Sequence, residues 1–479
     1  MHAAAGSRAT PGGSRSRRTP KGTQTMQSVR LTALGLGLGV AALVAAGAGS
    51  RAAGRSPAPA LASGTVLDSA RVDSVHLPSD GALLEQDITF YARRAAEDPQ
   101  SAADRGTLAA LHLQRARATG GFDDYARAEA LAAQSLALRS DRNGAAVATL
   151  AAALLARHAF TEALAVVRRA DSLHPGEPAT VALLAEVELE VGDYDAARRH
   201  FERVRHEAQR VTIGARLARW YEVTGRADLA RGILRRANAR LDGRKDLPRE
   251  QAAWFHYRLG ELELRTGGLD SAEASFRRGL ALWPDDYRIL GAMARLEAAR
   301  GRWGRAIEFG DRAVALHLDP TTLGVLGEAH AALGDSAQGA QWARAMTVSA
   351  LAQPGPIHRA WGLFLLDHGT ARDARAVLAR SRRDLRTRRD IYGYDLYAWA
   401  LHRAGRNAQA HGAMADALAQ GTEDPQLHYH AGVIARAVGD SAAARTHLAR
   451  ALRMAPGFGA RQAARARAVL DSLGGAGGG

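Results

Sequence analysis

Histidine and arginine are the residues of this sequence whose types and spacing come nearest to a chemical site. His428 and His430 form an H-x-H motif, with His402 and His411 upstream. Imidazole nitrogens are ligands for zinc and copper. Residues two positions apart on a helix point to different sides, however, and no carboxylates at ligand spacing accompany these histidines. The sequence therefore favours no metal site.

The densest basic run is ARDARAVLARSRRDLRTRRD, residues 371–390. Its arginines could contact phosphate, an anionic lipid or an acidic glycan. The alternative is a solvated helix face, whose charge Asp373, Asp384 and Asp390 partly offset. The arginines in this run are Arg372, Arg375, Arg380, Arg382, Arg383, Arg386, Arg388 and Arg389.

Catalytic motifs are missing from the sequence in the contexts that they require. No G-x-S-x-G, H-E-x-x-H or phosphate-binding loop stands between a predicted strand and helix. Cysteine is absent, which excludes disulfides, thiolate metal ligands and cysteine nucleophiles. The acidic residues form no pair that spacing alone marks as catalytic. We therefore expect no enzyme and no cofactor.

Composition predicts an all-α protein. Hydrophobic residues make up 47% of the 479 residues but aromatics only 5%, so the core must consist mainly of Ala, Leu and Val. Alanine has the highest helix propensity, and alternating β-branched runs are absent. The net charge of +15 comes almost entirely from arginine, because Lys21 and Lys245 are the only lysines. This excess indicates either a composition bias or a surface for nucleic acid or membrane.

The N-terminus resembles an export signal in its layout. A basic segment precedes the apolar run Leu31–Gly49, and Ala46-Gly47-Ala48 matches an A-x-A cleavage site. We expect residues 1–48 to be a signal peptide or an N-terminal membrane anchor, translated from Met1 or Met26. Residues 49–82 are predicted to be a flexible linker, and 474–479 a disordered glycine-rich tail. The chain is thus expected in the periplasm or cell envelope.

The rest of the chain repeats with a period of about 34 residues. A glycine is followed five residues later by an alanine in most periods. Gly334, which has Gly339 in place of the alanine, stands between Gly301 and Gly369 in this series. The step from Gly225 to Gly267 is longer than the others, so an insertion near 241–252 is a candidate break in the array. The repeated pairs are Gly192 and Ala197, Gly225 and Ala230, Gly267 and Ala272, Gly301 and Ala306, Gly369 and Ala374, Gly405 and Ala410, and Gly439 and Ala444.

Each period predicts two helices. An apolar-periodic segment precedes the glycine and another follows it. The glycine suits the left-handed end of the first helix, and an Asp or Ser often follows as a cap for the second. The alanine allows the two helices to approach closely. His158 stands where one of these glycines is expected.

This pattern resembles the tetratricopeptide repeat. The unit that starts at Ala253 has Leu259-Gly260, Gly267, Ala272, Phe276 and Pro284 at the positions of the family signature. The resemblance implies a right-handed superhelical α-solenoid of about ten helix-turn-helix repeats within residues 83–473, with a leading helix at 83–98 and a closing helix at 459–473. It also implies a concave groove, lined mainly by first helices, that binds a peptide or protein.

The repeat register predicts which side chains face this groove. Arginines and aromatic rings there suit carboxylates and extended peptides through paired hydrogen bonds and stacking. For each position the alternative is a solvated or interhelical side chain. The expected groove residues are Arg216, Arg219, Tyr257, Arg295, Arg359, Trp399, His402, Arg403, Tyr429, His430 and Arg436.

Three functional hypotheses follow from these observations. The first is a non-enzymatic scaffold or adaptor in the periplasm or envelope, with a protein or peptide partner in the groove. The second is a polysaccharide-export or secretion component, whose arginines contact an acidic polymer or an outer-membrane pore. The third, a nucleic-acid or lipid binder that uses residues 371–390, has the least support.

Overall fold

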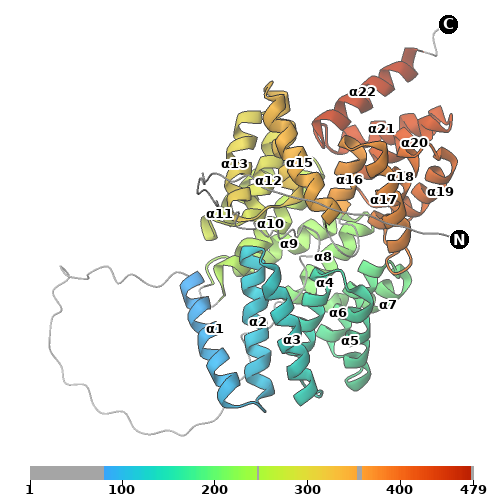
Figure 1. The fold of residues 1–479 in the computed structure, drawn as a ribbon. Coiled ribbons are helices and arrows are strands. Elements are labelled where there is room, and N and C mark those ends of the chain that lie inside the picture. The colour runs from blue at the N-terminus through green and yellow to red at the C-terminus, as the bar shows by residue number, and fades with distance from the viewer. Residues whose placement is uncertain (1–79, 245–246, 353–358, 476–479) are drawn as a thin grey trace, which may run out of the picture. The chain divides into compact units, whose positions relative to one another are not determined.

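The computed structural model describes residues 80–244, 247–352 and 359–475 (Figure 1). The predicted export signal, nearly all of the predicted linker and residues 476–479 of the predicted tail lie outside these ranges. The described residues belong to one compact unit and form α-helices, one short 3-10 helix and no strand. The predicted all-α class is confirmed.

Ten helix pairs follow one another between a leading helix, α1 (Asp80–Glu97), and a closing helix, α22 (Ala460–Gly475). The predicted number of repeats is therefore confirmed for the described residues. The first helices are α2 (Ala102–Thr119), α4 (Gly144–Ala156), α6 (Pro178–Val191), α8 (Val211–Val223), α10 (Arg249–Arg265), α12 (Tyr287–Ala299), α14 (Pro320–Ala332), α16 (Arg359–His368), α18 (Ile391–Arg403) and α20 (Pro425–Ala437). The second helices are α3 (Phe122–Leu138), α5 (Phe160–Leu173), α7 (Tyr194–Val204), α9 (Ala227–Leu241), α11 (Leu269–Leu282), α13 (Trp303–Leu316), α15 (Ser336–Ala352), α17 (Ala371–Asp384), α19 (Asn407–Leu418) and α21 (Ser441–Met454). The 3-10 helix η1 (Arg205–Glu207) follows α7.

The turns inside the pairs explain most of the glycine ladder. Left-handed backbone, which costs a residue with a Cβ atom about 1–2 kcal/mol, occurs at most of these glycines. His158 adopts the same conformation, with φ of 61°, where the glycine is missing. Gly369 is the exception, because α17 begins there with a capping box formed by Thr370 and Asp373. The ladder glycines with positive φ are Gly192, Gly225, Gly267, Gly301, Gly405 and Gly439.

The alanine ladder marks the closest approach of the two helices in a pair. Ala374 is 7% exposed and the other ladder alanines, Ala197, Ala230, Ala272, Ala306, Ala410 and Ala444, are fully buried. In the α14–α15 pair the matching residue is Gly339, where an added Cβ atom would lie 2.9 Å from the carbonyl oxygen of Gly327. Small residues at this position therefore set the spacing between the paired helices.

Loops far apart in the sequence also touch one another. The Arg389 N–H donates a 2.8 Å hydrogen bond to the Val191 carbonyl, and the Thr422 hydroxyl donates one to the Val223 carbonyl. A Cβ atom added at Gly267 would collide with the carbonyl oxygen of Met454. The turns after α6, α8 and α10 thus pack on the loops that lead into α18, α20 and α22.

Successive first helices pack together along the array, but α8 and α10 do so less closely than the others. The residues between α9 and α10 are the insertion that the sequence shows near 241–252. Glu222 of α8 is instead linked to Arg258 and Arg265 of α10 by ion pairs of 2.8 and 2.9 Å. Ion pairs therefore bridge these two helices where their direct contact is sparse.

Candidate functional site

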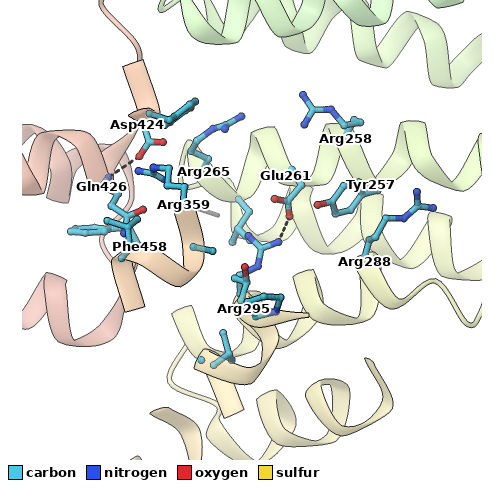
Figure 2. A pocket seen from close by; sticks show the side chains of 18 of the residues that line it. Tyr257, Arg258, Glu261, Arg265, Arg288, Arg295, Arg359, Asp424, Gln426 and Phe458 are labelled. Atoms are coloured by element: carbon cyan, nitrogen blue, oxygen red, sulfur yellow. Dashed lines mark hydrogen bonds and ion pairs between the residues drawn. The ribbon is translucent and has the colours of Figure 1, made fainter. Parts of the chain in front are cut away.

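The first helices surround a cavity of about 940 Å³ (Figure 2). Its volume is at the upper end of the range of about 300–1,000 Å³ that small-ligand pockets occupy. Loops close parts of its wall, including Phe458 from the segment between α21 and α22. Of the described lining residues, ten are arginine and seven are aspartate or glutamate, so the wall carries a small positive excess.

Helix α10 shows how the repeat places side chains in this wall. Trp254, Arg258, Glu261 and Arg265 line the cavity. Their spacing of three and four residues puts them on one face of the helix. The opposite side of the helix carries residues such as His256 and Leu259, which are 3% and 8% exposed. Packing on one face therefore presents the other to the cavity.

Most cavity arginines are paired with acids. The guanidinium of Arg216 lies 2.8 Å from Glu186, and that of Arg295 lies 2.6 Å from Glu261 (Figure 2). Burial tends to lower the pKa of Arg295, but attraction to Glu261 outweighs it and leaves the pKa raised. Burial also raises the pKa of the Glu186 carboxyl, despite the opposing attraction of Arg216. The arginines are therefore fixed positive charges in a partly desolvated wall.

One buried glutamate, Glu222, is surrounded by three arginines. Burial raises the pKa of Glu222, but attraction to Arg258, Arg265 and Arg219 overcomes this effect and leaves the pKa below its ordinary value. The ring of Tyr392 lies between two further guanidinium contacts, 5.6 Å from Arg219 and 4.7 Å from Arg359. These distances fit cation–π attraction. The cavity thus has a region where arginines gather around few acids.

Five of the predicted groove residues line the cavity. They come from the first helices of four different pairs, which is where the repeat register places groove residues. Lining the cavity does not by itself show that they bind a partner. The five are Arg216, Arg219, Tyr257, Arg295 and Arg359.

The other six do not line the cavity, which corrects the predicted cluster in α18 and α20. Trp399, Tyr429 and His430 are at most 3% exposed. Trp399 stacks on His430 at a centroid distance of 4.3 Å, and His430 lies 2.6 Å from the Asp395 carboxylate. These large rings fill the contact between α18 and α20, because burying their apolar area there is more favourable in free energy than exposing it to water. His402, Arg403 and Arg436 lie nearer the ends of these helices and are also outside the lining.

The sequence-based set also missed cavity residues. Arg258 and Arg265 line the cavity, as do Arg117, Tyr125 and Arg288. The α10 pair had a usable signal, because both residues continue the helical spacing of Trp254 and Glu261. Arg117 and Tyr125 had none, since their place in the wall depends on how the first pair packs against later ones.

The histidine motif and most of the basic run lie outside the cavity lining, and Arg388 is the residue of the run that lines it. His428 Nδ1 lies 2.9 Å from His447 Nδ1, and no group of three described His, Asp or Glu residues is arranged to hold a metal. In the basic run, Arg388 is paired with Asp390 and lies over the Phe160 ring. The exposed arginines of the run are Arg372, Arg375, Arg382, Arg383, Arg386 and Arg389. Among the described helices, none is long and apolar enough to cross a membrane.

Comparisons with known structures find helical repeat proteins. Pseudomonas aeruginosa PilF is 16% identical and has a TM-score of 0.35, over 43% of this chain and 92% of its own. Human IFIT1, solved as a dimer with m7Gppp-AAAA, is 15% identical with a TM-score of 0.45, over 71% and 77%. Yeast Tom70 is 11% identical with a TM-score of 0.31, over 77% and 96%. Similarities this low carry no information about function.

Family comparisons bear directly on the repeats. No curated protein matches the sequence of this chain. Models of the tetratricopeptide repeat match residues 154–212, 257–322 and 398–457. These three stretches fall in the early, middle and late parts of one run of helix pairs. Most of the other helix pairs share the period and the turn glycine, and the chain contains tetratricopeptide repeats in these three stretches.

Proposed function

We propose that this protein is a non-catalytic scaffold that holds a short segment of a partner protein in the cavity between its first helices. Its tetratricopeptide repeats support a role in protein interaction. The cavity is the observation that supports binding at this place. It joins aromatic residues such as Trp254 and Phe458 to a row of charged groups on rigid helices.

The size and chemistry of the cavity favour a short segment as its occupant. About 940 Å³ is far too little for a folded domain. Aromatic and apolar walls favour side-chain burial, while fixed polar groups orient what is bound. A peptide offers both side chains and regularly spaced backbone groups. This combination favours a peptide over a purely apolar ligand.

Peptide selection with the full chain tests this proposal. Peptides enriched from a random library are measured by fluorescence anisotropy against the wild type and a variant with a filled cavity, Thr321→Trp. Thr321 of α14 lines the cavity, so an indole there is expected to weaken binding at least about tenfold. Thr446→Trp is the matched control, because Thr446 is exposed on α21 and outside the lining. Equal binding to both variants, or no enriched peptide, contradicts the proposal.

We also propose that the protein is exported to the periplasm or cell envelope. The support is the order of a basic segment, the apolar run Leu31–Gly49 and the Ala46-Gly47-Ala48 motif. Fractionation of cells that make the full chain, followed by N-terminal sequencing, tests the location. A protein recovered from the cytoplasm with residues 1–48 intact contradicts it.

A second candidate function uses the exposed arginines of the 371–390 run. Six arginines of this segment face solvent, which favours contact with an acidic polysaccharide or an outer-membrane pore. Binding through exposed charges weakens steeply with salt. An interaction that disappears at high salt and on neutralisation of Arg382 and Arg383, but is unaffected by Thr321→Trp, would favour this function over the cavity scaffold.

A further inference from the structure

Three arginines of the cavity share one buried carboxylate. Nη2 of Arg258 and Nη2 of Arg265 lie 2.8 and 2.9 Å from the Glu222 carboxylate, and Nη1 of Arg219 lies 3.6 Å from it. The Glu222 side chain is 3% exposed and is not part of the lining, whereas all three arginines are. Glu222 therefore lies behind the guanidinium groups and holds them at the cavity wall.

In the immediate neighbourhood of Glu222, the arginines outnumber the acids. Glu190 is the second acid beside it, 3.6 Å from Arg219, so three guanidinium groups face two carboxylates. Arg359, 4.7 Å from the centroid of the Tyr392 ring, adds a further positive charge and pairs with Asp395 at 2.6 Å. Arg288 shows the opposite arrangement, because it has two acids to itself, Glu250 at 2.7 Å and Asp286 at 2.6 Å. The three arginines beside Glu222 are thus less completely paired with acids than Arg288 is.

Asp424 lies close to this cluster and also caps a helix. Figure 2 shows Asp424 beside Arg265 and Arg359. Its carboxylate caps α20 by accepting hydrogen bonds from the backbone N–H groups of Gln426 and Leu427. These contacts occupy one of its two oxygens. Counting Asp424 and Asp395, four arginines lie among four acids, so this cluster is distinguished by its unused hydrogen-bond donors and not by a net charge.

The arginines have donors to spare. Arg258 and Arg265 each use Nη2 to reach Glu222, and their Nε and Nη1 atoms make no hydrogen bond to any residue that the structure describes. A guanidinium has five N–H donors in a planar fork, which matches the two oxygens of a carboxylate. Their side chains are only 14% and 23% exposed, so a bound anion would be largely shielded from water.

We propose that Arg219, Arg258 and Arg265, held by Glu222, form a subsite for the carboxylate groups of an acidic peptide segment. The proposal rests on the cavity scaffold and names the chemistry of its partner. The five acids elsewhere in the wall would repel a long polyanion such as nucleic acid. A short segment with clustered carboxylates can place its charges on the arginines and its remaining groups against Trp254 or Phe458.

Defined peptides test the subsite. The full chain is titrated with fluorescein-labelled hexaglutamate whose C-terminus is amidated, and with hexaglutamine amidated in the same way. We expect hexaglutamate to bind at least about tenfold more tightly, since charge-assisted hydrogen bonds are roughly twice as strong as neutral ones. Hexaglutamine with a free C-terminus distinguishes side-chain carboxylates from the carboxylate at a chain end. If its affinity equals that of hexaglutamate, a chain-terminal carboxylate is the group that the subsite binds.

Variants locate the binding. Arg258→Gln with Arg265→Gln is expected to abolish the preference for hexaglutamate, which means an affinity loss of about tenfold or more. Arg277→Gln with Arg305→Gln is the matched control, because it removes the same charge from arginines that are 69% and 53% exposed and outside the lining. Arg258→Lys with Arg265→Lys keeps the charge without the planar fork. It should retain only part of the preference, and it replaces the glutamine pair if circular dichroism shows that pair to be unfolded.

Different results overturn the two proposals. If library peptides bind in a manner that Thr321→Trp blocks, but hexaglutamate is no better than hexaglutamine, the scaffold stands and the acidic subsite is wrong. Full binding of hexaglutamate by the Arg258 and Arg265 variants also overturns the subsite. If hexaglutamate binds and Thr321→Trp leaves its affinity unchanged, the peptide binds outside the cavity and the subsite is again wrong. If no peptide of any kind binds, both proposals fail.

Discussion

The phenol oxygen of Tyr194 accepts a 2.7 Å hydrogen bond from the backbone N–H of Ile391, a residue 197 positions further along the chain. Tyr194 begins α7 and Ile391 begins α18, so the bond joins repeats from different parts of the array. Ile391 is 1% exposed, which leaves water little access to its N–H group. The hydroxyl group of Tyr194 thus provides the hydrogen-bond acceptor for the first backbone N–H of a distant helix.

Tyr194→Phe is expected to lower the free energy of unfolding by about 1–3 kcal/mol, because the ring stays while the Ile391 N–H loses its buried partner. Chemical denaturation followed by circular dichroism measures the change. Tyr397→Phe is the matched control, since the Tyr397 hydroxyl makes no hydrogen bond to a described residue. Equal midpoints for the two variants would mean that the Tyr194 bond does not contribute to stability.

Gly225→Ala should destabilise the protein more than Gly439→Ala. Both glycines have positive φ, 70° and 89°, so alanine costs each about 1–2 kcal/mol in backbone strain. A Cβ atom at Gly225 would also collide with the backbone of Gly421, whereas one at Gly439 would meet nothing within 4 Å. The collision should add at least about 1 kcal/mol. Thermal unfolding of both variants compares them, and identical losses would show that these loops do not touch in solution.

Ala444→Leu is expected to cost about 1–3 kcal/mol by overpacking the α20–α21 pair. Ala444 is fully buried, and Leu448 one turn later already packs against Gly432 of α20. Ala442→Leu, at an exposed position of the same helix, should leave the melting temperature nearly unchanged. A variant with leucine at 444 that melts like the wild type would mean that the two helices are less closely packed than the structure shows.

Glu222→Gln should lower the free energy of unfolding by about 3–5 kcal/mol, because it leaves Arg219, Arg258 and Arg265 without their common counter-charge in a buried place. Glu308→Gln removes a carboxylate that is 53% exposed and pairs with Arg305, so it should cost less than about 1 kcal/mol. Urea midpoints of the two variants provide the comparison. A loss at Glu222 no larger than at Glu308 would contradict the buried cluster.

Acid should destabilise the protein through His428. Burial, with repulsion from Arg450 and His447, lowers the pKa of His428 to about 4 from an ordinary value near 6.5. Between these pH values the unfolded chain binds a proton that the folded chain does not, so stability falls as the pH drops from 6.5 towards 4. The lowered pKa of His447 acts in the same direction.

Urea midpoints measured across this pH range test the effect. His428→Gln removes one of the two titrating groups and should flatten the pH dependence. His206→Gln, at a side chain that is 70% exposed, should leave the slope of the wild type unchanged. A slope that is the same in all three proteins would show that His428 titrates normally in the folded state.

The repeat architecture was readable from the sequence because its determinants are local. A glycine that must adopt positive φ and an alanine that must fit between two helices recur at a fixed spacing, as Gly267 and Ala272 do, and each needs only its own pair of helices. The same locality explains His158, whose left-handed backbone follows from its place in the ladder. Helix type, helix pairing and the number of repeats were therefore predictable.

The site was predictable only where one helix determines which way a side chain faces. Arg216, Arg219, Tyr257, Arg295 and Arg359 line the cavity as their register indicates, but Trp399 and His430 do not. Large rings at equivalent positions pack between α18 and α20 because that junction offers them a buried surface. The contact of Tyr194 with Ile391 depends on small rotations summed over the repeats between them, while that of Glu222 with Arg258 and Arg265 depends on how the insertion after α9 places α10. No single period of the sequence encodes such a sum, and the tertiary structure alone decides it.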